Sequence, residues 1–211
     1  MALEATHIKF ALDLREKYSI KKLDVYLSGA IYPDSRYLTK IDRKLCHRDE
    51  VLAPEFADND FKKGWAIHFL GDKTQNRALD IILPDLLGDD KIKVWGTPWW
   101  INKTAVKNIA DIEIFKNFDI QPYLPLLDYV ENPHNEDIDK IKKYNQIVQK
   151  LYQGKNQITL QDIGEFWIDL GLSEEMTKKV LDRTKEYLSD SDVVEKIKSL
   201  YPKMLELAKE F

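Results

Sequence analysis

Cysteine is almost absent from this chain of 211 residues, whose only thiol is that of Cys46. A single cysteine excludes a disulfide within the chain. It also suits a reducing compartment, and we expect a cytoplasmic protein. Cys46 itself is more typical of a small buried residue than of a metal ligand.

Long apolar runs and an excess of positive charge are also missing. No stretch approaches the ~18 apolar residues of a membrane-spanning helix, and the first residues lack the basic start and apolar run of a signal peptide. Lys and Arg number 32 against 36 Asp and Glu, which gives a net charge of −4. We therefore expect neither DNA nor a membrane span among the interactions of this protein.

Glycine is scarce, with 8 residues, and strand-like alternation of apolar and polar residues is rare and short. Apolar positions instead recur at helical spacing, as in Leu3, His7, Phe10 and Leu14. The apolar fraction of 44% and the charged fraction of 32% are those of a globular protein. The sequence therefore predicts an all-α protein, a multi-helix bundle that forms a single domain over residues 1–211.

Helix start and stop signals predict the elements of the first part of the chain, residues 1–85. The helices expected there are Leu3–Lys17, Leu23–Ala30 and Pro54–Leu83. The second of these is expected to stop at Gly29 and Pro33. Residues 31–53 are predicted to form a loop, with a short helix as one option. Residues 85–100 are expected to be irregular, with a short strand at Lys91–Trp95 as one option.

Residues 101–211 are predicted to supply additional helices that complete the bundle, and they contain no chemical motif that we recognise. Helices are expected to resume after Asn102. Thr159 and Asp162 have the spacing of a capping box, for a helix that ends near Leu170. The other helices expected are Asp137–Tyr152, one capped by Ser173 that reaches Leu188, and one capped by Asp192 that reaches Lys209.

The histidines carry the first chemical signal, because three of the four lie within the first 68 residues. His7 is on the apolar face of its helix and is expected to point inward. Taken alone, it is more typical of a core histidine with one hydrogen bond than of a metal ligand. His134 is expected to be a solvated loop residue without a role.

His68 and Asp72 are four residues apart, so their side chains share one face of a helix, one turn apart. Imidazole nitrogen and carboxylate oxygen at this spacing can bind one metal ion at about 2.0–2.2 Å. Their neighbours are apolar, and an unpaired carboxylate there would cost several kcal/mol. The alternative is that Asp72 accepts a hydrogen bond from His68 or pairs with Lys73 or Arg77.

His47 and Asp34 precede this helix. His47 lies in a charged stretch, where a surface histidine is the alternative, and Asp34 follows Pro33, where an ordinary turn aspartate is the alternative. Three histidines and two aspartates on two helices and a loop can nevertheless converge in space. Such a set of imidazoles and carboxylates suits zinc, iron or manganese.

The same residues resemble a known family. Gly64–Asp72, which ends in the order His-Phe-Leu-Gly-Asp, is similar to the metal-binding helix of the bacterial zinc-dependent phospholipases C and of the related fungal single-strand nucleases. His7 matches the early histidine ligand of that family. Leu27–Asp34 resembles its Gly-x-x-x-Pro-Asp turn, whose aspartate is a ligand or a general base, and His47 fits the next histidine. The resemblance covers roughly residues 1–80 and implies the helical fold of that family.

This chain also departs from the family. The phospholipases have a further histidine just after the helix, near the place of Ala78, and a later His-x-x-x-Glu pair, whereas His134 is the only later histidine here. The resemblance therefore implies one or two metal ions rather than three. The HD-type phosphohydrolases offer a functional analogy for such a reduced set, although their adjacent His-Asp dipeptide is missing.

Together these observations predict a metal-dependent hydrolase of phosphate esters, with a small-molecule or lipid ester as substrate. His7, His47, His68 and Asp72 would hold one or two divalent ions, zinc first, with manganese or iron as alternatives. The ion would activate a water molecule, and Asp34 would be a further ligand or the catalytic general base.

Basic and aromatic residues complete this hypothesis. The residues expected to hold the phosphate are Arg36, Arg43 and Lys73. The residues expected to wall the pocket are Trp95, Trp99 and Trp100, although three tryptophans in a small protein are more often core or interface.

The alternative function is a non-catalytic helical binding or interaction protein that retains a structural metal site. The missing family ligands favour it, whereas the polar neighbours Asp34, Arg36 and Arg43 favour the enzyme. A metal that keeps an open, water-filled coordination position would discriminate between the two. The sequence predicts no oligomeric state.

Overall fold

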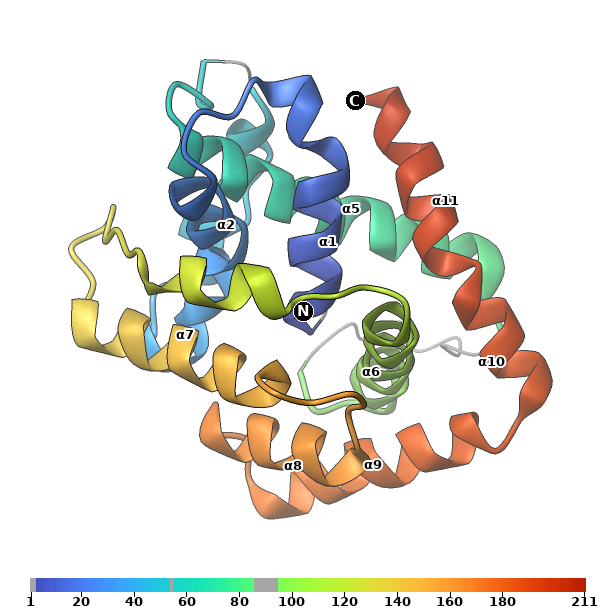
Figure 1. Ribbon diagram of the computed structural model, residues 1–211. Helices are drawn as coiled ribbons and strands as arrows, with labels where there is room; N and C mark the ends of the chain where they lie inside the picture. The colour runs from blue at the N-terminus through green and yellow to red at the C-terminus, as the bar shows by residue number, and fades with distance from the viewer. Residues whose placement is uncertain (1–2, 54, 86–94) are drawn as a thin grey trace.

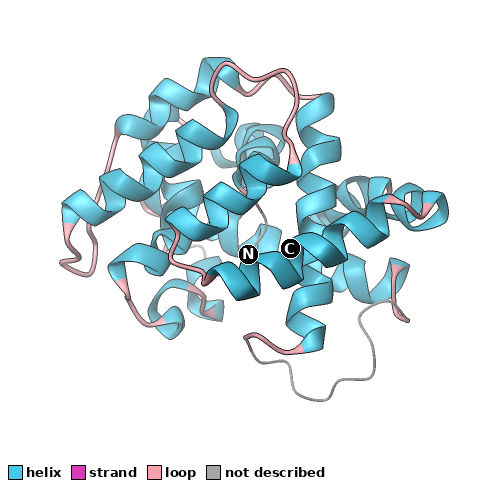
Figure 2. Ribbon diagram, turned by 90° about the horizontal axis from the view of Figure 1, so that it is seen from below, coloured by secondary structure: helices cyan, strands magenta, loops and turns pink. Residues whose placement is uncertain are grey.

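The structure, a computed structural model, describes residues 3–53, 55–85 and 95–211. Within these ranges the chain forms helices and loops and contains no strand (Figures 1 and 2). The all-α, multi-helix fold expected from the sequence is therefore confirmed. The elements before the gap at 86–94 are α1 (Glu4–Leu14), η1 (Arg15–Tyr18), α2 (Leu23–Ile31), η2 (Tyr32–Ser35), α3 (Arg36–Thr39), α4 (Arg43–Cys46), η3 (Asp49–Leu52) and α5 (Asp60–Ile82), where η denotes a 3₁₀ helix.

The second part of the chain continues the helical pattern and wraps around the first (Figure 1). Its elements are α6 (Pro98–Lys116), η4 (Gln121–Asp128), α7 (Ile138–Tyr152), α8 (Leu160–Asp169), α9 (Glu174–Leu188), α10 (Ser191–Lys198), α11 (Leu200–Leu207) and η5 (Ala208–Glu210). Helix α6 packs against α9, and α11 packs against α5. None of the described helices combines the length and the apolar character that crossing a lipid bilayer requires.

The ends of the first helices differ from the sequence prediction. Helix α1 ends at Leu14 and gives way to η1, because a tighter 3₁₀ turn closes its C-terminus before Ser19 adopts a left-handed conformation with φ 48°. Helix α5 begins at Asp60 rather than at Pro54, which lies outside the described residues. The side chain of Asn59 accepts a hydrogen bond of 2.9 Å from the backbone N–H of Lys62, and this cap defines the start.

Residues 31–53 are not the loop that the sequence predicts. They form four short helical segments, η2, α3, α4 and η3. Pro33 lies in the first turn of η2, where a missing backbone N–H costs nothing, so it continues the helical path instead of ending it. Asp34 is consequently held in a helical turn directly after α2.

Helices α2 and α5 cross at two glycines. A Cβ atom added to Gly29 would lie 2.0 Å from the carbonyl oxygen of Phe61, and one added to Gly64 would lie 2.0 Å from that of Tyr26. Only glycine lets the two backbones approach so closely. The prediction that Gly29 stops the helix is wrong, because α2 continues through it to Ile31.

Helix α6 begins earlier than predicted. Pro98 occupies its first turn, and the side chain of Thr97 accepts a hydrogen bond of 3.4 Å from the backbone N–H of Trp100. The Thr-Pro pair is thus a cap followed by a preorganised first residue. Trp99 and Trp100 therefore belong to a helix rather than to an irregular segment. The strand considered at Lys91–Trp95 lies, except for Trp95, outside the described residues.

The helices after residue 137 follow the prediction more closely. The capping box of Thr159 and Asp162 is present at the start of α8. The last predicted helix is instead divided into α10 and α11, and Asp190 rather than Asp192 caps it. Pro202 explains the break, because it cannot donate to the carbonyl of Lys198, four residues earlier, and its ring crowds that oxygen.

The first turn of α1 is anchored by residues from α6 and α7. Asp111 accepts hydrogen bonds of 2.8 Å from the backbone N–H and from the hydroxyl of Thr6. The hydroxyl of Tyr152 accepts from the backbone N–H of Ala5 and donates to Asp111. These contacts satisfy N–H groups that have no partner within a helix, and they fix the position of α1.

Candidate metal centre

His68 and Asp72 lie on the buried face of α5, one turn apart, as their spacing predicts. The Nδ1 atom of His68 is 2.8 Å from the carbonyl oxygen of Ala30, across the close crossing with α2. A carbonyl oxygen can only accept, so Nδ1 carries the proton and Nε2 presents its lone pair. This is how metal-binding histidines are oriented in proteins.

His47 follows α4 directly and points to the same place. Its Nε2 atom lies 3.3 Å from Nε2 of His68 and 3.5 Å from Oδ2 of Asp72. The ring is buried, so the alternative of a surface histidine is wrong. The preceding Cys46 is buried as expected, and its carbonyl oxygen accepts a hydrogen bond of 2.6 Å from the indole N–H of Trp65, which holds this turn against α5.

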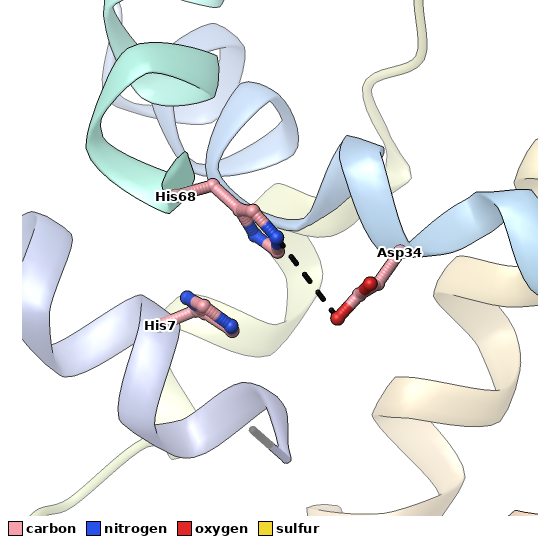
Figure 3. A group of neighbouring side chains, drawn as sticks. All are labelled: His7, Asp34 and His68. Atoms are coloured by element: carbon pink, nitrogen blue, oxygen red, sulfur yellow. Dashed lines mark ion pairs between the residues drawn. The ribbon is translucent and has the colours of Figure 1, made fainter. Parts of the chain in front are cut away.

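Asp34 reaches the cluster from η2, and Figure 3 shows it facing His7 and His68. Its carboxylate oxygens lie 3.8 Å from Nε2 of His47 and 4.0 Å from Nε2 of His68. The side chain is 1% exposed, yet neither oxygen has a hydrogen-bond donor. Burial contradicts the alternative of an exposed turn aspartate, and a buried carboxylate without a donor is one that a nearby cation would stabilise.

His7 projects from α1 and lies against one face of the His68 ring. The two rings are stacked, with centroids 3.9 Å apart and an angle of 17° between their planes. His7 is buried, and neither of its nitrogens has a hydrogen-bond partner. A core histidine is expected to make one hydrogen bond, but His7 makes none. Both of its nitrogens are therefore unused, next to Asp34 and His68.

Two overlapping groups in this cluster have the composition of a metal site. In each, one potential ligand atom per residue lies within 4.8 Å of the others. The groups are His47, His68 and Asp72, and His7, Asp34 and His68. In a tetrahedral site with metal–ligand bonds of about 2.0–2.1 Å, neighbouring ligand atoms lie about 3.3–3.4 Å apart. The 3.3 and 3.5 Å separations around His47 fit that geometry, and the separations to Asp34 are somewhat wider.

Burial keeps the three histidines neutral. It lowers the pKa of His7 well below the ordinary value, lowers that of His68, and together with neighbouring His68 lowers that of His47 to about 3. A neutral imidazole has the free lone pair that a metal ion needs. The cluster is therefore ready to bind a cation at neutral pH without first releasing protons from its histidines.

Lys107 in α6 is a member of the site that the sequence reasoning missed. Its ammonium lies 3.4 Å from Oδ1 of Asp72, and the residue is 2% exposed. Burial by itself would raise the pKa of Asp72, but the charge of Lys107 contributes to holding it well below the ordinary value. Lys103 and Lys107 are four residues apart, and this spacing was a signal that could have placed both on one helix face.

Glu4 is a second residue that was missed. It is fully buried and accepts a hydrogen bond from the hydroxyl of Tyr144. Burial and the charge of nearby Asp34 raise its pKa well above the ordinary value. The three-residue spacing between Glu4 and His7 on α1 is the pattern that could have indicated it.

The residues predicted to hold a phosphate divide into two groups. Arg36 and Arg43 line a cavity of about 480 Å³ beside the cluster, and the Nε atom of Arg36 is 3.9 Å from Asp34. Lys73 does not line it, and instead pairs with the exposed Asp49 at 2.8 Å. The expected tryptophans Trp95, Trp99 and Trp100 all line this cavity, together with Trp167, which was not foreseen.

His134, for which no role was predicted, stays outside the cluster. Its ring packs edge-on against Trp65 with centroids 5.5 Å apart, and it is half-buried rather than fully solvated.

Comparison with known proteins gave no match. No protein-family model matches the chain. No curated protein and no solved structure matches it either. The case for a function therefore rests on the geometry and chemistry of the residues themselves.

Proposed function

We propose that this protein is a metal-dependent hydrolase of phosphate esters. The observation that carries the proposal is Asp34, a buried carboxylate without a hydrogen-bond donor that faces three buried, neutral histidines. His47, His68 and Asp72 are the ligands that fit best, with Asp34 as a fourth ligand or as the general base. The set of two imidazoles and one carboxylate is one that catalytic zinc sites use.

Charge supports a divalent ion at this place. Asp34 and Asp72 bring two negative charges, and the three histidines bring none. Lys107 and Arg36 approach one carboxylate each, at 3.4 and 3.9 Å, but Arg36 makes no hydrogen bond to Asp34. A divalent ion would compensate both carboxylates and give Asp34 the partner that it lacks.

Zinc is the first choice of ion, with manganese or iron as alternatives, because imidazole and carboxylate ligands suit all three. His7, Asp34 and His68 form the second group, so the proposal includes one or two ions. Membership of the zinc-dependent phospholipase C and single-strand nuclease family is part of the same proposal. The convergence of the residues that carry that resemblance supports it.

The chemistry divides between the ion and the chain. A divalent ion, when bound, lowers the pKa of a coordinated water molecule from about 16 to about 7 in the best cases. The carbonyl of Ala30 orients His68 with its Nε2 lone pair free, and in this proposal Asp34 accepts a proton. In this proposal Arg36, Arg43 and Lys107, which line the adjoining cavity, bind the phosphate.

The non-catalytic alternative has an observation in its favour. Asp34, His47, His68 and Asp72 are all buried, and four protein ligands around one ion would leave no open position. The protein would then be a helical binding or interaction protein with a structural metal. The cavity beside the cluster favours the enzyme, because a structural site needs no lined space next to it.

The compartment and the class of substrate are the last part of the proposal. A single buried thiol, Cys46, supports a cytoplasmic protein. A net charge of −4 supports a small-molecule or lipid phosphate ester rather than DNA as the substrate.

Asp34→Asn tests the proposal and separates the two roles of Asp34. If Asp34 is the general base, the variant should keep its metal and lose roughly 10²–10⁴ in turnover of an aryl phosphate. If Asp34 is a required ligand, the variant should lose metal as well as turnover. The measurements are metal content by elemental analysis and hydrolysis of aryl phosphate mono- and diesters.

Asp49→Asn is a matched control, because Asp49 is an exposed carboxylate that pairs only with Lys73 among the ion pairs of the described residues. It should retain both metal and turnover. Full metal and undiminished turnover in Asp34→Asn would remove Asp34 from the site. Absence of turnover in the wild type with zinc, manganese or iron would favour the structural-metal alternative.

A further inference from the structure

The cavity beside the candidate metal cluster is lined by more basic than acidic side chains. Its volume is about 480 Å³, which lies in the range of small-molecule sites. Arg36, Arg43, Lys103 and Lys107 line it, whereas Asp80 is the only acidic side chain among the described lining residues. The cavity therefore offers a net positive charge to an occupant.

Two of these cations also touch the proposed metal ligands. Lys107 approaches Asp72 at 3.4 Å, and Arg36 approaches Asp34 at 3.9 Å. They stand between the cluster and the cavity, so an anion bound to them would lie next to the metal. Burial and the charge of Lys107 lower the pKa of Lys103 to about 7, so above this pH the positive charge of the cavity comes from Arg36, Arg43 and Lys107.

The remaining wall is aromatic. Trp99 and Trp100 come from the first turn of α6, and Trp167 comes from α8. The rings of Trp100 and Trp167 are 6.4 Å apart, edge to face. Leu79 is the only aliphatic side chain in the described lining, so the wall suits a flat ring better than an acyl chain.

We propose that this cavity binds the phosphate monoester of a planar, aromatic alcohol. The phosphate dianion lies among Arg36, Arg43 and Lys107, and the aromatic group lies against Trp99 and Trp100. A monoester carries up to two negative charges and a diester only one, so three cations, Arg36, Arg43 and Lys107, against the single Asp80 favour the monoester. A lipid substrate is disfavoured by the scarcity of aliphatic wall.

The proposal rests on the proposed function for its view that the ester is hydrolysed. In that reaction a bond forms between phosphorus and the oxygen of water, and the bond between phosphorus and the aromatic oxygen breaks. The proton lost by water is taken up through Asp34 and reaches the leaving oxygen, and the products are inorganic phosphate and the aromatic alcohol.

The test is a binding experiment that needs no turnover. Benzylphosphonate, which cannot be hydrolysed, is titrated calorimetrically into the metal-loaded protein at pH 8. Two control compounds are titrated in the same way. Methylphosphonate lacks the ring, and the monomethyl ester of benzylphosphonate has one negative charge fewer. We expect benzylphosphonate to bind about tenfold tighter than either. Equal affinities, or no binding of any probe, would overturn the proposal.

Variants locate the bound probe. Arg43→Gln should weaken benzylphosphonate about tenfold, and Lys44→Gln, an equal change of charge at the exposed neighbouring residue, should not. Trp99→Leu should weaken benzylphosphonate but not methylphosphonate. Circular dichroism establishes that each variant is folded, and wild-type affinity in folded Arg43→Gln and Trp99→Leu would overturn the assignment.

The outcome is separable from that of the proposed function. Binding of benzylphosphonate as expected without hydrolysis of any aryl phosphate would leave this cavity assigned and the hydrolase proposal refuted. Hydrolysis without a preference for the aromatic monoester would support the hydrolase proposal and refute the assignment of this cavity.

Discussion

At the scale of the residue, His68 combines two contacts that together define its chemistry. Its Nδ1 atom donates to Ala30, and its Nε2 atom faces His47 and Asp34. Stacking against His7 holds the ring on its other side. A ring restrained in this way has little rotational freedom to lose when it binds an ion, which favours binding.

His68→Ala should therefore remove most of the bound metal. Wild-type protein purified without chelator should carry one to two divalent ions per chain, which stabilise it by about 3–4 kcal/mol when free metal is 100 to 1,000 times the dissociation constant. The variant should melt at a lower temperature, and chelator should lower that temperature no further. Elemental analysis and thermal melts with and without chelator measure this.

The control for this prediction is His134→Ala, which removes a histidine outside the cluster. It should keep its metal and its response to chelator. If His68→Ala responds to chelator as the wild type does, His68 is not a ligand.

At the scale of the element, the crossing of α2 and α5 determines where the ligands lie. Gly29 and Gly64 bring the two backbones together, and that approach places the carbonyl of Ala30 against His68. The chain then continues from α2 into η2 without a break and delivers Asp34 to the same point. The site thus depends on the distance between two helices as much as on the identity of its ligands.

Gly64→Ala tests this dependence. Its Cβ would lie 2.0 Å from the backbone oxygen of Tyr26, which cannot rotate away, so the helices must separate. We expect a loss of about 3 kcal/mol in the free energy of unfolding, in spite of the better helix propensity of alanine. Metal affinity should fall as well, because Ala30 moves away from His68. Denaturant unfolding and metal titration measure the two effects.

Gly164→Ala is the matched control in α8. Its added Cβ would lie 2.9 Å from the end of the flexible Leu181 side chain and 3.8 Å from the methyl group of Thr177, so both of its neighbours are side chains rather than backbone. Metal affinity should be unchanged there. Unchanged metal affinity in Gly64→Ala would show that the crossing does not position the site.

At the scale of the whole molecule, burial of neutral histidines links stability to pH. The pKa values of His7, His47 and His68 are lowered by burial, so the unfolded chain binds protons near pH 6.5 that the folded protein does not. Stability from these residues is present above about pH 6.5 and is lost as the pH falls. Asp111, whose pKa burial raises to about 6, and Glu4 act in the opposite sense.

The metal-free protein should accordingly lose stability between pH 7.5 and 5, because three histidines outnumber the two opposing acids. His47→Gln removes one of the protons taken up on unfolding. The dependence of its unfolding free energy on pH should be shallower by up to ~1.4 kcal/mol per pH unit. Denaturant unfolding in chelator across this range measures both slopes, and parallel curves would contradict the assignment of His47 as a neutral buried residue.

Several features of this protein follow from local sequence. Helical periodicity was sufficient for the fold class, and the capping box of Thr159 and Asp162 was read correctly, because caps act over three residues. The pairing of His68 with Asp72 on one face follows from the pitch of a helix alone. The Thr97-Pro98 start of α6 was equally local and was overlooked.

Tertiary structure decided the rest, because it joins residues that are far apart in the chain. Gly29 lies against the backbone of Phe61, 32 positions later, so its role as the contact point with α5 depends on a residue far along the chain. The burial of His47 likewise depends on the packing of α5 against it. Lys107 and Asp72 meet across 35 positions. Sequence spacing encodes contacts within one helix, whereas contacts between helices depend on how closely their backbones pack. The contacts between helices leave Asp34 buried, without a hydrogen-bond donor, beside three neutral histidines.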